Sequence, residues 1–264
     1  MLKDFAICYN HKMELSSEIK DILEKSLKNR KRRVDVFDID NLKPGYDFIF
    51  VIGGDGTILK ACRFYTKFQT PVFGVNLGRL GFLAQASGDE IETCVEKILE
   101  GRYKTESRIM LKSGENTALN DFVVKDNSTG RTSRFSLKIN GKAVCDYLAD
   151  GIIVATPTGS TAYGLSAGGP VLTPGLNAFV IVPICPHTLT ARPLVVPDSG
   201  KITICTGNEE YVVFADGQEC FEFKSEITIE KSEYSAKLAL LEDTEFYSIL
   251  RSKLHWGTSP IETC

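Results

Sequence analysis

The sequence predicts an α/β domain followed by a β-rich domain, and two observations support this fold class. In the first hundred residues, apolar runs that suit strands alternate with stretches of helical periodicity, a pattern typical of a parallel sheet with helices on its faces. From about residue 103, short strand-like runs between turn residues dominate, and helical periodicity is nearly absent until residues 243–254. We therefore expect two domains of different class.

The N-terminal elements follow from apolar spacing. Strands are expected at residues 4–9, 33–39, 46–52 and 71–77. The run at 46–52 is continuously apolar, which suits a strand covered on both faces. A helix is expected over residues 57–68, and two further helices have one apolar face each: Leu15, Ile19, Ile22, Leu23 and Leu27 in the first, and Ile91, Val95, Ile98 and Leu99 in the second.

The C-terminal strands are short and separated by turn residues. They are expected at residues 134–140, 151–156, 178–184, 201–205, 210–216 and 226–231. Turn sequences such as NGK, TGNE and DGQE lie between them. A last helix is expected at residues 243–254.

Composition excludes several classes of protein. The chain has 264 residues, a net charge of −3 and dispersed charges, which argues against a general nucleic-acid-binding surface. None of the eight cysteines forms a C-x-x-C pair, so single thiols in a reducing compartment are favoured over disulfides or a zinc site. No apolar run approaches membrane-spanning length and no signal-peptide core is present. We expect a cytoplasmic protein without membrane contacts.

The stretch VIGGDGT, residues 51–57, is the first candidate site. An apolar run enters the glycines and a helical pattern leaves them, so the amides of Gly53, Gly54, Gly56 and Thr57 could bind phosphate at a helix N-terminus. The spacing matches neither the Walker loop nor the dinucleotide-binding G-x-G-x-x-G motif. A plain connecting turn is the weaker interpretation, and the negative charge of Asp55 needs a separate explanation.

Three further segments contain candidate site residues. The segment TGSTAY, residues 158–163, suits hydrogen bonding to a ribose or base edge, or else a simple helix cap. Gly164–Gly168 matches the G-x-S-x-G elbow of hydrolases around Ser166, but the preceding strand ends about ten residues too early. Asn120 and Asp121 begin an otherwise apolar segment, where a strand-end turn is an ordinary explanation.

Taken in order, the motifs GGDGT, LND and DGIIVATPTGSTAYGLSAGGP resemble those of the NAD kinases, which phosphorylate the 2′-hydroxyl of the adenosine ribose of NAD. The resemblance extends through GVNLGRLGFL (74–83), PICPHTLTARPLVVP (183–197), DGQ (216–218) and KLHWG (253–257). It implies a Rossmann-like α/β domain of residues 1–104 joined by 241–264, and a β-rich NAD-binding domain of residues 105–240. The NAD kinase and diacylglycerol kinase folds share this architecture. The ligand site is expected in the cleft between the two domains.

The resemblance also implies roles for individual residues. Asp55 is the general base, and the GGDG loop and a divalent ion, Mg²⁺ or Mn²⁺, hold the phosphates of ATP or polyphosphate. No protein ligand of the metal is assigned. The acceptor NAD is expected to contact Asp55, Gly56, Lys60, Asn120, Asp121, Arg131, Leu148, Asp150, Thr161, Ala162, Tyr163, Ser166, Cys185 and Gln218. A homodimer or homotetramer is implied, with the last helix packed on the N-terminal domain.

Three alternatives remain at this point. A lipid kinase also uses GGDGT, but the complete TPTGSTAY stretch and the lack of an amphipathic membrane helix oppose it. A serine hydrolase would need Ser166 and a base such as His187 or His255. A sensor that binds NAD without turnover would have no use for Asp55.

Overall fold

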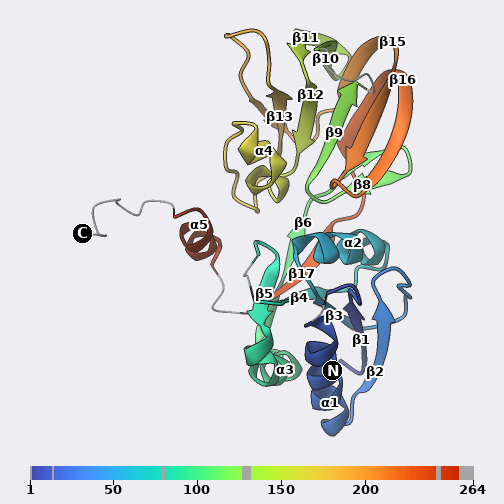
Figure 1. Ribbon diagram of the computed structural model, residues 1–264, viewed down its shortest axis with the longest axis vertical. Coiled ribbons are helices and arrows are strands. Elements are labelled where there is room, and N and C mark those ends of the chain that lie inside the picture. The colour runs from blue at the N-terminus through green and yellow to red at the C-terminus, as the bar shows by residue number, and fades with distance from the viewer. Residues whose placement is uncertain (1, 14, 79–80, 127–131, 242–244, 256–264) are drawn as a thin grey trace, which may run out of the picture. The chain divides into compact units, whose positions relative to one another are not determined.

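The computed structural model describes residues 2–13, 15–78, 81–126, 132–241 and 245–255 (Figure 1). The chain forms two compact units, residues 1–107 with 237–264, and residues 108–236. A mostly parallel α/β sheet and an antiparallel β-sheet are their respective centres, so the predicted fold class is confirmed.

A mostly parallel sheet forms the centre of the N-terminal unit. Its strand order is β2 (Arg33–Asp38), β1 (Asp4–Tyr9), β3 (Phe48–Ile52), β4 (Val72–Asn76), β17 (Ala236–Leu241) and β6 (Tyr103–Arg108), with β5 (Ala84–Ser87) paired to β4. Every residue of β3 and β4 is buried, as expected for strands covered on both faces. The last strand of the chain therefore lies inside the N-terminal sheet, between β4 and β6.

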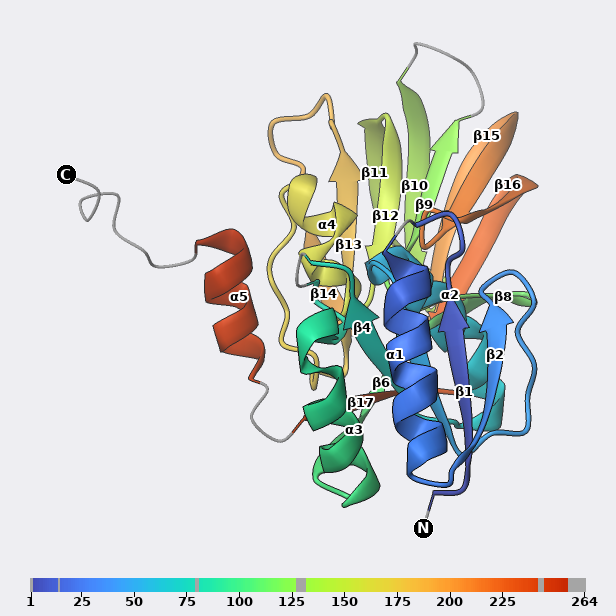
Figure 2. The same cartoon turned by 60° about the horizontal axis from the view of Figure 1, so that its bottom comes forward.

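Helices cover both faces of this sheet. α1 (Ser16–Asn29) and α3 (Ile91–Leu99) lie together on one face, and α2 (Asp55–Tyr65) lies on the other (Figure 2). Leu23 and Leu27 of α1 are buried as predicted, but Ile22 is 46% exposed and Leu15 precedes the helix. Ile22 and Leu23 are about 100° apart around the helix axis, and it is Leu23 that packs into the core.

An antiparallel sheet forms the C-terminal unit. Its order is β14 (Leu194–Pro197), β13 (Ala178–Ile184), β12 (Gly151–Ala155), β9 (Asp121–Asp126), β15 (Ile202–Ala215), β16 (Glu219–Lys231), β7 (Leu111–Ser113) and β8 (Asn116–Ala118). A hairpin of β10 (Ser133–Ile139) and β11 (Lys142–Ala149) joins β15 through β10. The large core cluster lies on one face and a smaller one lies on the other.

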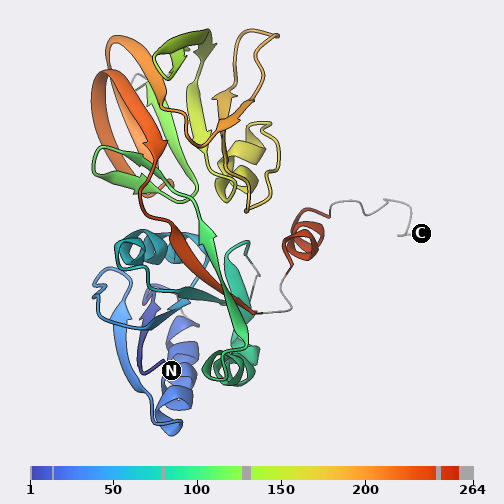
Figure 3. The same cartoon turned by 180° about the vertical axis from the view of Figure 1, so that it is seen from behind.

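The two strands predicted at 201–205 and 210–216 are one strand, β15. Its pairing with β16 continues through a register irregularity between Cys205 and Glu210, where the sequence suggested a turn. β16 likewise begins at Glu219 rather than at residue 226, and the long hairpin is visible in orange in Figure 3. Several side chains of β16 face solvent, which conceals the apolar alternation that predicts a strand.

The predicted C-terminal helix corresponds to α5 (Phe246–Leu254). Its packing on the N-terminal domain stays a prediction, because residues 242–244 lie outside the described part of the chain. Among the described residues, no helix has both the length and the apolar character needed to cross a membrane.

Candidate functional site

The GGDGT loop joins β3 to α2, as the sequence predicts. Gly53 follows the last residue of β3, and a Cβ atom there would lie 2.6 Å from Thr57 Oγ1, so only glycine fits. Gly54 is the exposed N-cap residue, and a Cβ at Gly54 would meet no atom within 4 Å. Gly56 is also exposed. The main chain of the loop is therefore open to a ligand at the N-terminus of α2.

Asp55 is the first residue of α2, and the main chain of a neighbouring segment holds its carboxylate. The amide of Phe82 donates to Asp55 Oδ2 at 2.9 Å, and the amide of Leu83 donates to Oδ1 at 3.2 Å. A Cβ added to Gly81 would lie 1.9 Å from Asp55 Oδ1. The carboxylate is therefore packed directly on the backbone of residues 81–83, which fixes its position. Sequence analysis assigned no role to Gly81.

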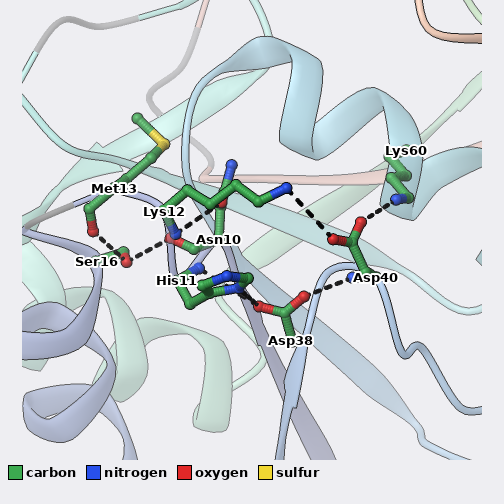
Figure 4. Close-up of polar contacts among 8 residues, drawn as sticks. All are labelled: Asn10, His11, Lys12, Met13, Ser16, Asp38, Asp40 and Lys60. Carbon is green, nitrogen blue, oxygen red and sulfur yellow. Dashed lines mark hydrogen bonds and ion pairs between the residues drawn. The ribbon is translucent and has the colours of Figure 1, made fainter.

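Lys60 belongs to a polar cluster near the ends of β1 and β2 (Figure 4). Its amine donates to the carboxylate of Asp40, which Lys12 also approaches at 3.8 Å. The bond from Lys60 lowers the pKa of Asp40. Beside this group, His11 pairs with Asp38. Ion pairs between exposed side chains are weak, so an anionic ligand could compete with Asp40 for Lys60.

In the C-terminal unit, Asn120 and Asp121 form a turn that leads into β9, and Asp216 binds its main chain. Asp216 Oδ1 accepts from the amides of Asn120 at 2.7 Å and Asp121 at 3.2 Å, and Oδ2 accepts from that of Leu119 at 3.0 Å. Asp216 lies in the DGQ turn between β15 and β16. Sequence analysis missed it as a site residue, although DGQ was among the motifs carrying the resemblance.

The surroundings of Asp121 change the pKa of its carboxyl group. The residue is 4% exposed. Burial and, second, the charge of Asp216 raise its pKa to about 7. The carboxyl group is thus partly protonated at neutral pH, and in that form it can both donate and accept a hydrogen bond.

The segment after β12 supports the same turn from another direction. Thr156 Oγ1 donates to the carbonyl of Leu119 at 2.6 Å, and the Thr156 amide donates to the carbonyl of Asn120 at 2.9 Å. A Cβ on Gly159 would lie 2.1 Å from the backbone carbonyl oxygen of Asn120. The structure thereby brings the LND and TPTGSTAY motifs into contact.

The four candidates after Gly159 lie on a turn of 3-10 helix (Gly159–Thr161) and a one-turn helix α4 (Tyr163–Ser166), with Thr161 and Ala162 half-buried. Tyr163 is 39% exposed, and Lys125 Nζ of β9 lies 5.5 Å from the centroid of its ring. Lys125 was not among the predicted site residues, because the sequence has no local pattern for a contact between residues this far apart in the chain.

Ser166 does not have the surroundings of a hydrolase nucleophile. The 3-10 turn and α4 separate it from the end of β12 at Ala155, whereas a nucleophile elbow requires the strand to run directly into the serine turn. The G-x-S-x-G match is therefore a coincidence of sequence.

Three more candidates lie around one end of β13. The amide of Asp150 donates to the carbonyl of Ile184 at 3.0 Å, and that of His187 donates to the carbonyl of Leu148 at 2.8 Å. Cys185 lies between these contacts and has a φ of +44°. Leu148, Asp150 and Cys185 are all exposed, so the structure gathers them at one accessible end of β13.

Two of the predicted site residues stand apart from these groups. Gln218 is exposed in the turn that contains Asp216, and its backbone amide donates to the carbonyl of Ala215 at 3.0 Å. Arg131 lies outside the described residues. The loop residues Gly53–Thr57 and Lys60 belong to the N-terminal unit, and the other candidates belong to the C-terminal unit.

Comparison with known proteins identifies the family. The family model of the ATP-NAD kinase N-terminal domain matches residues 4–103, and that of the C-terminal domain matches residues 119–241. The chain is 42% identical over 234 residues to an NAD kinase of Carboxydothermus hydrogenoformans, covering 84% of each chain. It is 43% identical over 232 residues to an NAD kinase of Magnetococcus marinus, covering 83% of this chain and 77% of that one.

Two solved structures agree with the sequence comparisons. An NAD kinase from Archaeoglobus fulgidus in complex with ATP has a TM-score of 0.81 and 34% identity, with 96% of this chain and 98% of that chain covered. Yeast NADH kinase complexed with NADH has the same fold, with a TM-score of 0.81, 24% identity, and 98% and 89% covered. Sequence and fold thus agree over most of the length, and the chain belongs to the NAD kinase family of phosphotransferase enzymes.

Proposed function

We propose that this enzyme transfers the γ-phosphate of ATP to the 2′-hydroxyl of the adenosine ribose of NAD, giving NADP and ADP, with Asp55 as the general base. The observation that carries the proposal is the Asp55 carboxylate, which two backbone amides hold at the start of α2 beside an open glycine loop. The ATP bound in the Archaeoglobus relative and the NADH bound in the yeast enzyme support the pair of substrates.

In the proposed step, Asp55 accepts the proton of the ribose 2′-hydroxyl. The oxygen then forms a bond to the γ-phosphorus while the bond from that phosphorus to the β,γ-bridging oxygen breaks, and ADP leaves with the bridging oxygen. Positioning and electrostatic stabilisation are the main contributions that a protein makes to phosphoryl transfer, and a residue that orients or deprotonates the nucleophile is a recurring part of such sites. The Asp55 carboxylate therefore accepts the proton of the incoming hydroxyl group, although its charge repels the phosphates.

We assign the donor phosphates to Gly53, Gly54, Gly56 and Thr57. Among the described residues, no group of three or more His, Cys, Asp or Glu side chains could hold a metal ion. We propose that a Mg²⁺ or Mn²⁺ ion is bound mainly by the triphosphate and water, as Mg²⁺ usually is in kinases. When bound, the ion neutralises negative charge on the phosphates.

We assign the adenosine half of NAD to the C-terminal unit. Asn120 and Asp121 supply hydrogen-bonding groups, and Thr161, Ala162, Tyr163 and Ser166 line the base and ribose pocket. Asp150, Leu148 and Cys185 lie near the nicotinamide half, with Gln218, Lys60 and Arg131 as further contacts. A homodimer or homotetramer is expected, and light scattering during gel filtration would measure it.

The test is a coupled assay for NADP formation from NAD with ATP, with polyphosphate in a parallel arm and NADH as an alternative acceptor. We expect ATP-dependent formation of NADP and no phosphorylation of a diacylglycerol. NAD binding without product would support a sensor, and labelling of Ser166 by a fluorophosphonate would support a hydrolase. Either result would contradict the proposal.

A further inference from the structure

We infer that Asp216 is a positioning residue for the acceptor nucleotide, because its carboxylate fixes the main chain of residues 119–121 and so presents Asn120 and Asp121 to the adenosine half of NAD. The inference rests on the proposed function of that turn. Asp216 itself is not assigned a contact with either substrate.

Asp216 accepts several hydrogen bonds from one short segment of main chain. The three successive amides of residues 119–121 all donate to the Asp216 carboxylate, at 2.7 to 3.2 Å. In return, the Asp216 amide donates to the carbonyl of Asp121 at 2.9 Å. Hydrogen bonds to an ionised acceptor are stronger than those between neutral groups, so this contact fixes the conformation of the turn.

The main-chain hydrogen-bonding groups of this turn all have partners within the protein. Thr156 donates to the carbonyls of Leu119 and Asn120 through its hydroxyl and its amide. Together, Asp216 and Thr156 therefore bind every main-chain amide and carbonyl of residues 119–121. Within the described part of the chain, the side chains of Asn120 and Asp121 make no hydrogen bond. The protein thus fixes the backbone and leaves these side chains for a ligand.

Asp216 also has a backbone conformation that suits its place in the turn. Its φ is +52°, a region that disfavours most residues but that Asp and Asn tolerate. Ala215, next to it, pairs with Phe122, the second residue of β9. The register of β15 on β9 therefore brings the side chain to the turn, although 95 to 97 positions separate the bonded residues.

The experiment compares steady-state kinetics of the wild type, Asp216→Ala and Asp216→Asn in the coupled NADP assay, with NAD and ATP varied separately. Asp216→Ala removes all three acceptor bonds, and we expect a rise of at least about 30-fold in the KM for NAD. Asp216→Asn can keep the two bonds to Oδ1, but its side-chain NH₂ group replaces Oδ2 and faces the backbone amide of Leu119, which is also a donor. We therefore expect an intermediate rise of about 3- to 10-fold in the KM for NAD. In both variants the KM for ATP and kcat should stay within about threefold of the wild type.

Asp47→Asn is the matched control. Asp47 also accepts two backbone amides from a distant segment, those of Lys3 at 2.8 Å and Asp4 at 3.2 Å, but in the N-terminal unit. We expect Asp47→Asn to lower the melting temperature without changing the KM for NAD. A wild type that forms no NADP would refute the proposed function and the inference with it. If the wild type is active, two results would refute the positioning role alone. One is an unchanged KM for NAD in folded Asp216→Asn, and the other is a variant whose KM for NAD, KM for ATP and kcat are all impaired to the same extent.

Discussion

Replacing Gly81 with alanine is the most direct way to move the Asp55 carboxylate without changing Asp55 itself. The new Cβ atom would lie 1.9 Å from Asp55 Oδ1 and 2.5 Å from its Cγ, whereas an ordinary contact begins near 3.4 Å. The carboxylate must therefore move by more than about 1 Å, since an overlap of this size cannot be absorbed by thermal motion. Because Asp55 is anchored to the adjacent amides of Phe82 and Leu83, that movement breaks or distorts both bonds.

The size of the effect follows from these contacts. Misplacing a reacting group by about 1 Å costs about 100-fold in rate, and the loss of a general base costs about 100- to 10,000-fold. We therefore expect kcat of Gly81→Ala to fall by at least about 100-fold. The KM for NAD should change by less than about tenfold, because the adenosine contacts assigned to the C-terminal unit are untouched.

The assay is the coupled measurement of NADP formation, with circular dichroism to show that the variant is folded. Gly175→Ala is the matched control, because a Cβ at Gly175 meets no atom within 4 Å; its kcat should equal that of the wild type. A folded Gly81→Ala enzyme with kcat within threefold of the wild type would refute the assignment of Asp55 as the base.

Three further predictions concern the C-terminal unit. The pKa of Asp121 is raised from 3.8 to about 7, so the native state keeps this proton to a higher pH than the unfolded chain does, and stability is lost as pH rises from about 4 to about 7. In urea titrations, Asp121→Asn should remove up to about 4 kcal/mol of this pH dependence, and the same dependence of stability on pH in wild type and variant would contradict the prediction. Lys125→Met removes the cation near the Tyr163 ring and should raise the KM for NAD about 2- to 10-fold with kcat unchanged, whereas an unaltered KM would exclude a role for this pair. Gly159→Ala, whose Cβ would lie 2.1 Å from the Asn120 oxygen, should lower the unfolding free energy by about 1–3 kcal/mol and raise the KM for NAD, and a normal melting curve would count against the contact.

The sequence was sufficient to predict the local part of the site. The run at 46–52 becomes the buried strand β3, and the glycines after it lead into α2 at Asp55. Strand, turn and helix are adjacent in the chain, so apolar spacing and turn residues determine them. The resemblance to the family added the C-terminal candidates, for which local pattern alone favoured a turn or a cap.

Contacts between distant segments could not be predicted in this way. Gly81 is important because its missing side chain makes room for Asp55, and Asp216 because the register of β15 on β9 brings it to the Asn120 turn. Neither fact has a local pattern in the sequence. The single strand β15 was missed for a similar reason, since a partner strand continues past residues that are typical of a turn.

The central claim is that Asp55 removes the proton from the ribose hydroxyl, and Asp55→Asn tests it most directly. The measurement is kcat for NADP formation together with the dissociation constant of NAD from calorimetry. We predict a fall in kcat of at least about 100-fold with NAD affinity within about threefold of the wild type. An asparagine variant that turns over within tenfold of the wild type would contradict the account.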